Sequence, residues 1–370
     1  MRLVVDALAV RPGSAAIVTE NLLRGWAQAA PQDEIVVLTG GGSELRVPAG
    51  TTQLRVSTRA GVAARLWAQS VGVRRACATV RADALLCAVT TGALLGAPCR
   101  TGAVVYDLRH EARPRQFARH RRLARRLLYG WTFRRADALV CISERTRQDL
   151  VRNRPRLAAK ARTALLGSDH AAYWAPGPPD GPAYVLAFGH LPNKNVDVVL
   201  RAWACCDAPA TAAMTLRVCG LRGAARTAAA ARAAALGITG RVELLGRLDD
   251  ERFRSLFAGA AAVVFPSDFE GFGLPVVEAL RLAIPVVISA DPALLEVSAG
   301  HAVVCADGSA RALAAAIGQA LHRTPEQRER GRAHAEGLTW AETARQVRDA
   351  LTGEDLRRDH GPATTSAGQR

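Results

Sequence analysis

The sequence predicts an α/β protein with two doubly wound parallel sheets, one in each half of the chain. Short apolar, β-branched runs alternate with longer Ala-, Leu- and Arg-rich segments along the 370 residues, as is typical of parallel strands joined by crossover helices. The length suits two domains of ordinary size. A segment rich in Pro and Gly, 174–182, separates the halves. We therefore expect two Rossmann-like domains facing a cleft, the usual place for a ligand.

The expected strands follow one another at regular intervals. In the first half they are 3–8, 34–38, 84–88, 103–106 and 138–142, and in the second half 183–188, 215–219, 241–245, 261–265 and 284–288. The first domain is predicted to span 1–175 and the second 176–352. Residues 353–370 are polar and contain Gly, Ser and Thr, so we expect a flexible tail.

The net positive charge of the chain lies entirely in the first half. Residues 1–175 contain 28 Lys and Arg against 12 Asp and Glu, a net of +16, whereas 176–370 contain 21 of each. Segment 109–135 holds ten arginines and one acid, Glu111, with leucines and aromatic residues between them. Such a basic amphipathic segment suits an anionic membrane surface or an anionic acceptor. The alternative is a solvated face whose apolar residues pack inward.

Several classes of protein are not expected. No recognised nucleic-acid motif accompanies the charge, so nucleic acid is an unlikely partner. The sequence shows no signal peptide and no apolar run long enough to span a bilayer, so we expect a cytoplasmic protein, with 109–135 as its route to the inner face of the cell membrane. The eight Cys and eight His residues form no metal-ligand spacing, and no D-x-D triplet is present. We expect no bound metal and no cofactor.

Segment 266–280, PSDFEGFGLPVVEAL, carries the main functional signal. It follows an apolar strand, and Gly271 and Gly273 allow a ligand to approach the backbone closely. Pro275 suits the first position of a helix, whose free N–H groups and positive dipole end favour a phosphate. Glu270 and Glu278 flank that helix start and can face one ligand, such as a sugar nucleotide. Alternatively, the segment is an ordinary strand–loop–helix unit with a dipole-compensating Glu.

This segment resembles the signature PSxxEGFGLPxxEA of the retaining glycosyltransferases of family 4. The resemblance implies the GT-B fold, in which the acceptor contacts mainly the first domain and the nucleotide sugar mainly the second. A final helix commonly returns to the first domain, and 338–344 is similar to its start. The implied activity is transfer of a hexosyl or related sugar from a nucleotide-diphosphate sugar to a hydroxyl acceptor, with retention of the anomeric configuration.

The resemblance also implies a donor site. Segment 185–195 is similar to the family's G-x-x-x-P-R-K-N element, so Gly189 and Lys194 are expected at the diphosphate. The Arg position holds Asn193, and His190 is the expected substitute. Gly246 in V-x-x-L-G is implied at the base, whose identity main-chain contacts leave open. Gly271, Phe272, Gly273 and Leu274 line the donor, Glu270 contacts the transferred sugar as a catalytic residue, and Glu278 contacts the ribose. The amides of Gly273 and Leu274 point at the developing negative charge.

The acceptor side departs further from the family pattern. The usual His-Asp-Leu reads Tyr106-Asp107-Leu108, and we expect Asp107 to be catalytic with His110 in place of the missing His. The alternative for His110 is a surface residue. The usual Gly-Gly pair appears as Gly13-Ser14, implied at the acceptor. Ser143 is expected to cap the helix that follows it rather than contact substrate.

Two other functions stay open. The missing His and Arg are compatible with a catalytically silent GT-B-like binding or membrane-surface module. A GT-B sugar-nucleotide epimerase is the other candidate, although the E-x7-E spacing and its flanking elements argue against it. The acceptor is a glycan, a glycolipid or a small natural product, and the sequence distinguishes neither the acceptor nor the sugar.

Overall fold

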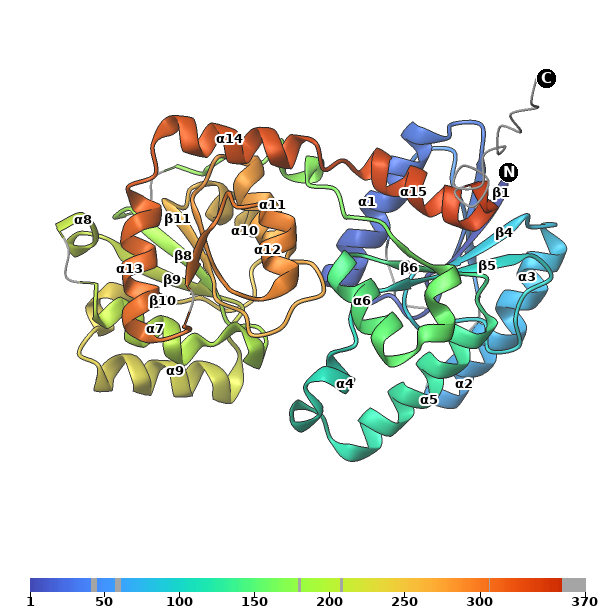
Figure 1. Ribbon diagram of the computed structural model, residues 1–370, viewed down its shortest axis with the longest axis horizontal. Helices are drawn as coiled ribbons and strands as arrows, with labels where there is room; N and C mark the ends of the chain where they lie inside the picture. The colour runs from blue at the N-terminus through green and yellow to red at the C-terminus, as the bar shows by residue number, and fades with distance from the viewer. Residues whose placement is uncertain (41–44, 57–60, 179–180, 207–208, 306, 355–370) are drawn as a thin grey trace, which may run out of the picture. The chain divides into compact units, whose positions relative to one another are not determined.

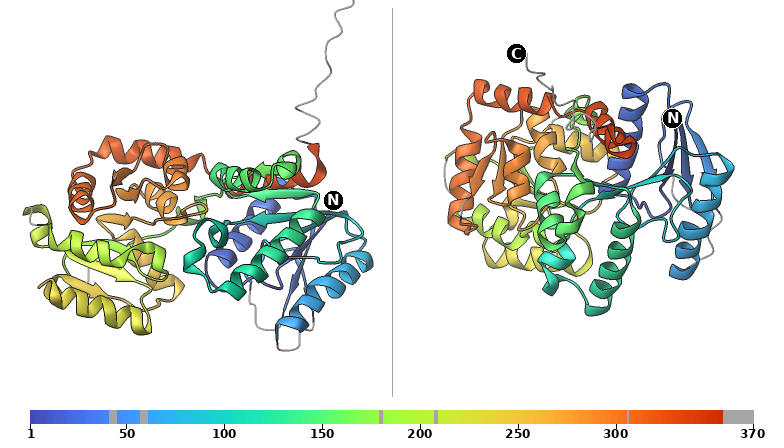
Figure 2. Two further views of the ribbon diagram at one scale, coloured as in Figure 1. Left: turned by 60° about the horizontal axis from the view of Figure 1, so that its bottom comes forward. Right: turned by 45° about the vertical axis from the view of Figure 1, so that its right-hand side comes forward.

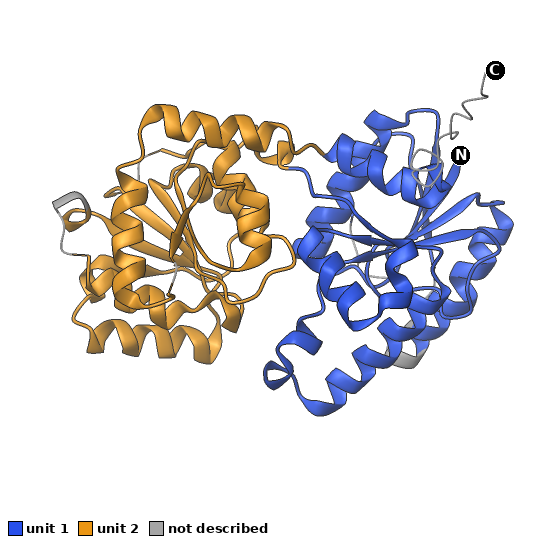
Figure 3. Cartoon of the chain, viewed as in Figure 1, with its two compact units in different colours: residues 1–167, 340–370 blue, residues 168–339 orange. Residues whose placement is uncertain are grey.

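The computed structural model describes residues 1–40, 45–56, 61–178, 181–206, 209–305 and 307–354 and divides the chain into two compact units (Figure 3). Unit 1 comprises Met1–Gly167 and Trp340–Arg370, and unit 2 comprises Ser168–Thr339. The division precedes the boundary that we predicted at residue 175. Ser168 explains this difference, because its hydroxyl donates to Ala335 O of unit 2 and its N–H donates to Leu338 O at 2.8 Å. Most of the predicted tail, 355–370, lies outside the described residues.

Unit 1 is built on a seven-stranded parallel sheet with the order β3-β2-β1-β4-β5-β6-β7 (Figure 1). Its strands are β1 (Arg2–Asp6), β2 (Glu34–Thr39), β3 (Thr52–Arg55), β4 (Ala84–Cys87), β5 (Arg100–Val105), β6 (Ala138–Cys141) and β7 (Ala161–Thr163). Its helices are α1 (Ser14–Ala29), α2 (Val62–Trp67), α3 (Val73–Thr79), α4 (Arg109–Ala112), α5 (Arg119–Arg135), α6 (Glu144–Asn153) and α15 (Trp340–Thr352), with a π-helical segment, Ala68–Gly72, between α2 and α3. The fully buried side chains of Leu85, Val105 and Phe133 belong to its core.

Unit 2 is built on a six-stranded parallel sheet with the order β10-β9-β8-β11-β12-β13. Its strands are β8 (Tyr184–Phe188), β9 (Thr215–Cys219), β10 (Val242–Leu244), β11 (Ala262–Phe265), β12 (Val286–Ser289) and β13 (Val303–Cys305). Its helices are α7 (Val196–Ala204), α8 (Pro209–Ala212), α9 (Gly223–Ala235), α10 (Asp250–Ala258), α11 (Leu274–Arg281), α12 (Pro292–Ser298), α13 (Ala310–Leu321) and α14 (Pro325–Glu336). Trp203, Leu216 and Val264 belong to its buried core.

Both sheets confirm the predicted fold class of two Rossmann-like, doubly wound units, and the ten expected strands are all present. Each sheet reverses its strand order once, between β1 and β4 in unit 1 and between β8 and β11 in unit 2. In such sheets ligands bind beyond the carboxyl ends of the strands at this reversal. The reversal in unit 2 therefore directs attention to the loops that follow β8 and β11.

Helix α15 belongs to unit 1 although it follows unit 2 in the sequence (Figures 1 and 2). It packs so closely on α1 that a Cβ atom at Gly25 would lie 2.1 Å from Trp340 O. The Arg348 guanidinium pairs with Asp33 at 2.9 Å. Among the described residues, none of the helices combines the length and the apolar character needed to cross a bilayer.

Candidate functional site

The loop after β11 leads into α11 through a glycine that no other residue replaces without strain. Gly273 has φ +107°, and a Cβ atom there would lie 2.5 Å from Leu294 Cδ2. The helix begins at Leu274, so Pro275 is its second residue and not the first, as we predicted. Proline is still tolerated there, because the N–H groups of the first turn have no partner within the helix. The first N–H groups of α11 thus follow directly on the loop that holds Glu270.

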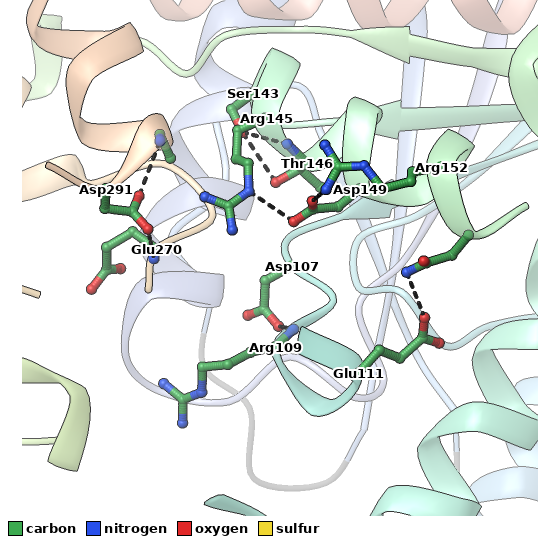
Figure 4. Close-up of polar contacts among 12 residues, drawn as sticks. Asp107, Arg109, Glu111, Ser143, Arg145, Thr146, Asp149, Arg152, Glu270 and Asp291 are labelled. Atoms are coloured by element: carbon green, nitrogen blue, oxygen red, sulfur yellow. Dashed lines mark hydrogen bonds and ion pairs between the residues drawn. The ribbon is translucent and has the colours of Figure 1, made fainter. Parts of the chain in front are cut away.

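Glu270 is held by a dense set of donors from two loops. Its Oε1 accepts hydrogen bonds from Asn193 Nδ2 at 3.0 Å and from Ser267 Oγ, and it forms an ion pair with Lys194 Nζ. Its backbone N–H lies 3.4 Å from Asp291 Oδ2 (Figure 4). Because β8 and β11 are adjacent and parallel, residues after their carboxyl ends meet at one edge of the sheet. The arrangement fixes Glu270 at the strand-order reversal of unit 2.

Asn193 has a structural part in this site. It is buried, and its Nδ2 lies within hydrogen-bond distance of Ser267 Oγ at 2.8 Å and of Phe269 O at 3.0 Å as well as of Glu270 Oε1. Its carbonyl accepts from the Asp268 N–H at 3.1 Å. The residue that stands at the expected Arg position therefore joins the β8 loop to the β11 loop and orients Glu270.

Lys194 is buried beside the same carboxylate. Its side chain is 5% exposed, and its Nζ lies 4.0 Å from the centroid of the Phe265 ring in addition to its ion pair with Glu270. A buried ammonium group requires a compensating negative charge, and Glu270 supplies it. The predicted phosphate ligand Lys194 and the predicted sugar ligand Glu270 are thus direct partners.

Glu278 has a different partner. It lies in α11, is 3% exposed, and its Oε1 is 2.9 Å from His170 Nε2. The His170 ring in turn packs edge-on against Trp174 at 5.7 Å between centroids. His170 and Ser267 are two site residues that sequence reasoning missed. Ser267 stands inside the signature segment, and His170 directly follows Gly167-Ser168-Asp169, which resembles a G-x-D element of family 4, so both had a sequence neighbour that pointed to the site.

The predicted donor-side glycines differ in what they do. A Cβ atom at Gly189 would lie 2.6 Å from Leu221 Cδ2, so this glycine is needed for packing between the β8 and β9 loops. Gly246 accepts a hydrogen bond from the Gly220 N–H at 3.0 Å, and no described atom lies within 4 Å of a Cβ built on it. Phe272 is buried, whereas Gly271 is half-buried.

His190 does not supply the second positive charge that we expected. His190 is partly exposed. Burial of the rest of the side chain and, to a smaller extent, the charge of Lys194 lower the pKa of His190 to about 4. The imidazole is therefore neutral at pH 7. A neutral ring still offers one donor and one acceptor, but it is no counterpart of an arginine.

The unit 1 residues lie at the carboxyl end of β5 and at the start of α1. Asp107 Oδ1 accepts from the Arg109 N–H at 2.8 Å, at the start of α4 (Figure 4). Tyr106 donates its hydroxyl to Ala88 O at 3.0 Å, and burial raises its pKa, so it is a neutral phenol. Gly13, with φ +125°, and Ser14 are exposed at the N-terminus of α1.

His110 is neither a surface residue nor an exposed ligand. Its side chain is fully buried, its ring packs edge-on against Tyr129 at 4.9 Å between centroids, and neither ring nitrogen forms a hydrogen bond with a described residue. Burial lowers the pKa of His110, so the ring is neutral at pH 7. The surface alternative was wrong because α5 covers α4. In the described structure the ring also has no free face for a substrate.

Ser143 caps α6, as expected. Its Oγ accepts from the Thr146 N–H at 3.0 Å (Figure 4). Within the part of the chain that the structure describes, no three His, Cys, Asp or Glu side chains gather closely enough to hold a metal ion.

Comparison with known proteins supports this description. Residues 173–337 match the model of the family described as glycosyl transferases group 1. A stretch of 115 residues is 36% identical to the O-antigen chain mannosyltransferase B of Escherichia coli, and it covers 30% of each chain. A stretch of 100 residues is 30% identical to the serotype-specific mannosyltransferase WbdA of Escherichia coli, covering 27% of this chain and 12% of WbdA. The chain thus matches less than a third of the length of these relatives.

Solved structures resemble the whole chain. Anabaena HepE, in complex with UDP and glucose, has a TM-score of 0.73 and 17% identity, covering 95% of this chain and 100% of that one. WaaG, a glycosyltransferase involved in lipopolysaccharide biosynthesis, has a TM-score of 0.72 at 17% identity over 95% and 100% of the two chains. Sucrose-phosphate synthase from Thermosynechococcus elongatus has 0.72 at 18% over 97% and 98%. The fold of two parallel-sheet, Rossmann-like domains is therefore GT-B.

Proposed function

We propose that this chain, in which residues 173–337 match the model of the glycosyl transferases group 1, transfers a sugar from a nucleotide-diphosphate sugar to a hydroxyl group of an acceptor. The observation that carries the proposal is the fixed position of Glu270 next to the N-terminus of α11, at the strand-order reversal of unit 2. A carboxylate beside a helix N-terminus offers separate places for the hydroxyls of a sugar and for an anionic diphosphate.

The donor would be held by the N-terminus of α11 and by the carboxylates of Glu270 and Glu278. The amides that follow Gly273 bind the diphosphate, and the phosphate oxygens provide Lys194 with a second anion besides Glu270. Glu270 then accepts hydrogen bonds from hydroxyls of the transferred sugar, and Glu278 accepts from the ribose. As the bond between the anomeric carbon and the diphosphate breaks, negative charge grows on the leaving group. The preorganised amides and Lys194 stabilise that charge, which is usually the largest catalytic contribution.

The finer features of the reaction rest on the resemblance to family 4 and on the named relatives. We infer retention of the anomeric configuration, a hexosyl donor, and an acceptor that is a glycan or glycolipid of polysaccharide biosynthesis. In unit 1 the exposed Gly13 and Ser14 are the proposed acceptor contacts. Asp107 is the proposed catalytic residue of this unit. His110 is not included, because its ring is buried.

The test is donor binding followed by donor hydrolysis. UDP-, GDP-, ADP- and dTDP-sugars are screened by thermal shift, since a ligand that binds the folded state raises the melting temperature. The best donor is then incubated without acceptor, and release of the nucleoside diphosphate is measured. Glu270→Gln is expected to lower this rate by about a hundredfold to a thousandfold, by analogy with loss of one group that stabilises a transition state. Glu251→Gln, an exposed residue of α10, is the matched control.

The outcomes separate the three functions. Hydrolysis that depends on Glu270 and sugar transfer to an added glycan support the transferase. Donor binding with no turnover supports the catalytically silent module. Conversion of the donor into its epimer, observed by NMR of the nucleotide sugar, supports the epimerase. If no nucleotide sugar raises the melting temperature, the proposal is wrong.

A further inference from the structure

Unit 1 contains an apolar groove that lies apart from the site residues described above. It has a volume of about 550 Å³. One wall is α2 and the π-helical segment after it, the second is α5, and the third is the loop after β4. The lining residues are Leu66, Trp67, Ser70, Val71, Leu94, Leu95, Leu127, Leu128 and Trp131.

The apolar residues of this groove and of its rim are unusually exposed. Trp67 is 67% exposed, Leu127 is 65% exposed and Leu95 is 50% exposed. Leu123, one helical turn before Leu127, is 59% exposed. A contiguous apolar surface rimmed by polar residues is typical of a site that binds a partner or a membrane.

The alternative that the apolar residues of 109–135 all pack inward is therefore wrong for part of the segment. Phe133 is buried in the core of unit 1, and Tyr129 packs against it. Leu123, Leu127 and Trp131 instead follow one another at intervals of four residues along an outward stripe of α5. Helix α5 thus has one apolar face toward the core and a second one toward solvent.

Positive charge runs beside this outward stripe. Arg122, Arg126 and Arg134 lie at four-residue multiples on the neighbouring stripe of α5, and all three are exposed. Within the described residues, the guanidinium groups of these three arginines form no ion pair and no hydrogen bond, whereas the Arg134 carbonyl accepts from Lys160 Nζ at 3.3 Å. Their charges are therefore available to an anionic partner. Trp131 is oriented by a hydrogen bond to Leu94 O and by the Arg135 guanidinium, 5.3 Å from its ring centroid.

We propose that α5 and the groove beside it form a docking face for the surface of an anionic lipid bilayer. The arginines bind lipid phosphates, while Leu123, Leu127 and the tryptophans Trp67 and Trp131 enter the boundary between headgroups and acyl chains. Tryptophan prefers this boundary, and a basic amphipathic helix lies in its plane.

The charge and the shape favour a bilayer over the other possible occupants. A second copy of the chain would bring the same arginines face to face, and like charges repel. Nucleic acid would use the arginines but leave the apolar groove and Leu127 without a partner. This inference does not depend on the proposed transferase activity, since none of its residues belongs to the donor site.

The test is flotation of the whole chain with vesicles of phosphatidylcholine containing phosphatidylglycerol, compared with phosphatidylcholine alone. Arg122→Glu combined with Arg126→Glu is expected to weaken binding by about thirtyfold or more, since each arginine near an anionic surface is worth about 1 kcal/mol. Leu123→Ser combined with Leu127→Ser is expected to weaken it by about tenfold or more. Arg226→Glu combined with Arg311→Glu, on exposed positions of α9 and α13 in unit 2, is the matched control and should bind as the unaltered chain does.

Depth is measured with lipids brominated on the acyl chain, which quench tryptophans that reach them. Quenching should fall when Trp67 and Trp131 are both changed to Phe. Equal binding by the α5 variants and the control, or binding that occurs without quenching, contradicts the proposal. So does a dimer in light scattering that the Leu123→Ser and Leu127→Ser changes dissociate, because the face would then join two copies.

Discussion

At the scale of single residues, Asn193 determines how Glu270 is presented. Its amide contacts Glu270 Oε1, Ser267 Oγ and Phe269 O within a buried space. Loss of a hydrogen bond to a charged group costs about 1.5–3 kcal/mol. We expect Asn193→Ala to lower the rate of donor hydrolysis by about tenfold to a hundredfold and to reduce the melting temperature. The measurement is kcat and KM together with thermal unfolding.

Two further variants make the role of Asn193 specific. Asn193→Arg restores the family residue, but only 2% of this position is exposed, so the larger side chain should destabilise unit 2 and give no tighter donor binding. Asn153→Ala removes an exposed amide that contacts Glu111 at 3.2 Å and should change little. Tighter donor binding by Asn193→Arg would show that the position acts as a phosphate clamp.

The sequence identified several members of this site, although not Ser267 or His170, and it did not identify their contacts. Glu270, Lys194 and Asn193 were all singled out, yet Asn193 and Glu270 are 77 residues apart, and only the neighbouring positions of β8 and β11 bring them together. Residue type also misleads when burial is unknown. His110 stands in a run of charged residues that suggests a surface, whereas Tyr129 from α5 covers it.

Asp6 gives unit 1 a pH dependence. It is fully buried at the end of β1, and its Oδ1 accepts from the Leu8 N–H at 3.1 Å. Burial raises its pKa to about 7, against the smaller lowering effects of hydrogen bonds from Leu8 and Gln69. The folded state therefore binds this proton more tightly than the unfolded state. Its contribution to the free energy of unfolding is fully present below about pH 4 and is lost as the pH rises through about 7.

We expect Asp6→Asn to remove that dependence, because the amide keeps the acceptor for Leu8 and never ionises. The difference in unfolding free energy between the variant and the unaltered chain should grow from pH 5 to pH 8, up to on the order of 4 kcal/mol. Urea unfolding at several pH values measures it. The buried histidines titrate equally in both proteins and cancel in the difference, and a difference that is flat with pH would contradict the assignment.

At the scale of elements, Gly273 connects the β11 loop to α11. Alanine there combines a left-handed backbone with a contact of 2.5 Å to Leu294 Cδ2, and we expect Gly273→Ala to cost about 1–3 kcal/mol. Because the strain acts on the start of α11, donor affinity should fall as well. The measurement is unfolding free energy and donor titration.

The control for this prediction is a glycine that lies inside a helix of unit 2. Gly318 lies within α13, and no described atom is within 4 Å of a Cβ atom built there. Gly318→Ala should stabilise the chain by about 0.5–1 kcal/mol. Equal effects of the two substitutions would show that the conformation of Gly273 is not what the loop requires.

Strands were predicted well in the sheet interiors and poorly at the edges. Buried β-branched runs such as β8 and β11 give a clear pattern, whereas β3, β7 and β13 were not anticipated. Three of the four residues of β3 are exposed, so pairing with β2 rather than burial defines it. β7 and β13 have three residues each. β10 is an edge strand of the same length, and it was predicted only as part of the longer segment 241–245. An edge strand is specified by its neighbour more than by its own composition.

At the scale of the whole molecule, the two units differ in charge and in the role that we propose for each. The positive excess lies in residues 1–175, and the exposed arginines of α5 belong to that half. The donor site that we propose in unit 2 uses few positive charges, because main-chain amides and one buried lysine are its proposed anion ligands. An excess of arginine in unit 1 is then available for an anionic surface, and the sequence showed this asymmetry before any contact was known.

The return of α15 to unit 1 means that residues 340–352 stabilise a domain from which unit 2 separates them in sequence. A Cβ atom at Gly25 would lie 2.1 Å from Trp340 O, backbone against backbone. We therefore expect Gly25→Ala to push α15 away from α1, weaken the Arg348–Asp33 ion pair and cost about 3 kcal/mol or more. Hydrogen exchange should become faster in α1 and α15 and stay unchanged in α9 and α13 of unit 2.

The control is Gly130→Ala in α5. No described atom lies within 4 Å of a Cβ atom built on Gly130, so exchange in α15 should stay as it is in the unaltered chain. If Gly25→Ala and Gly130→Ala behave alike, the close packing of α15 on α1 is not what holds unit 1 together.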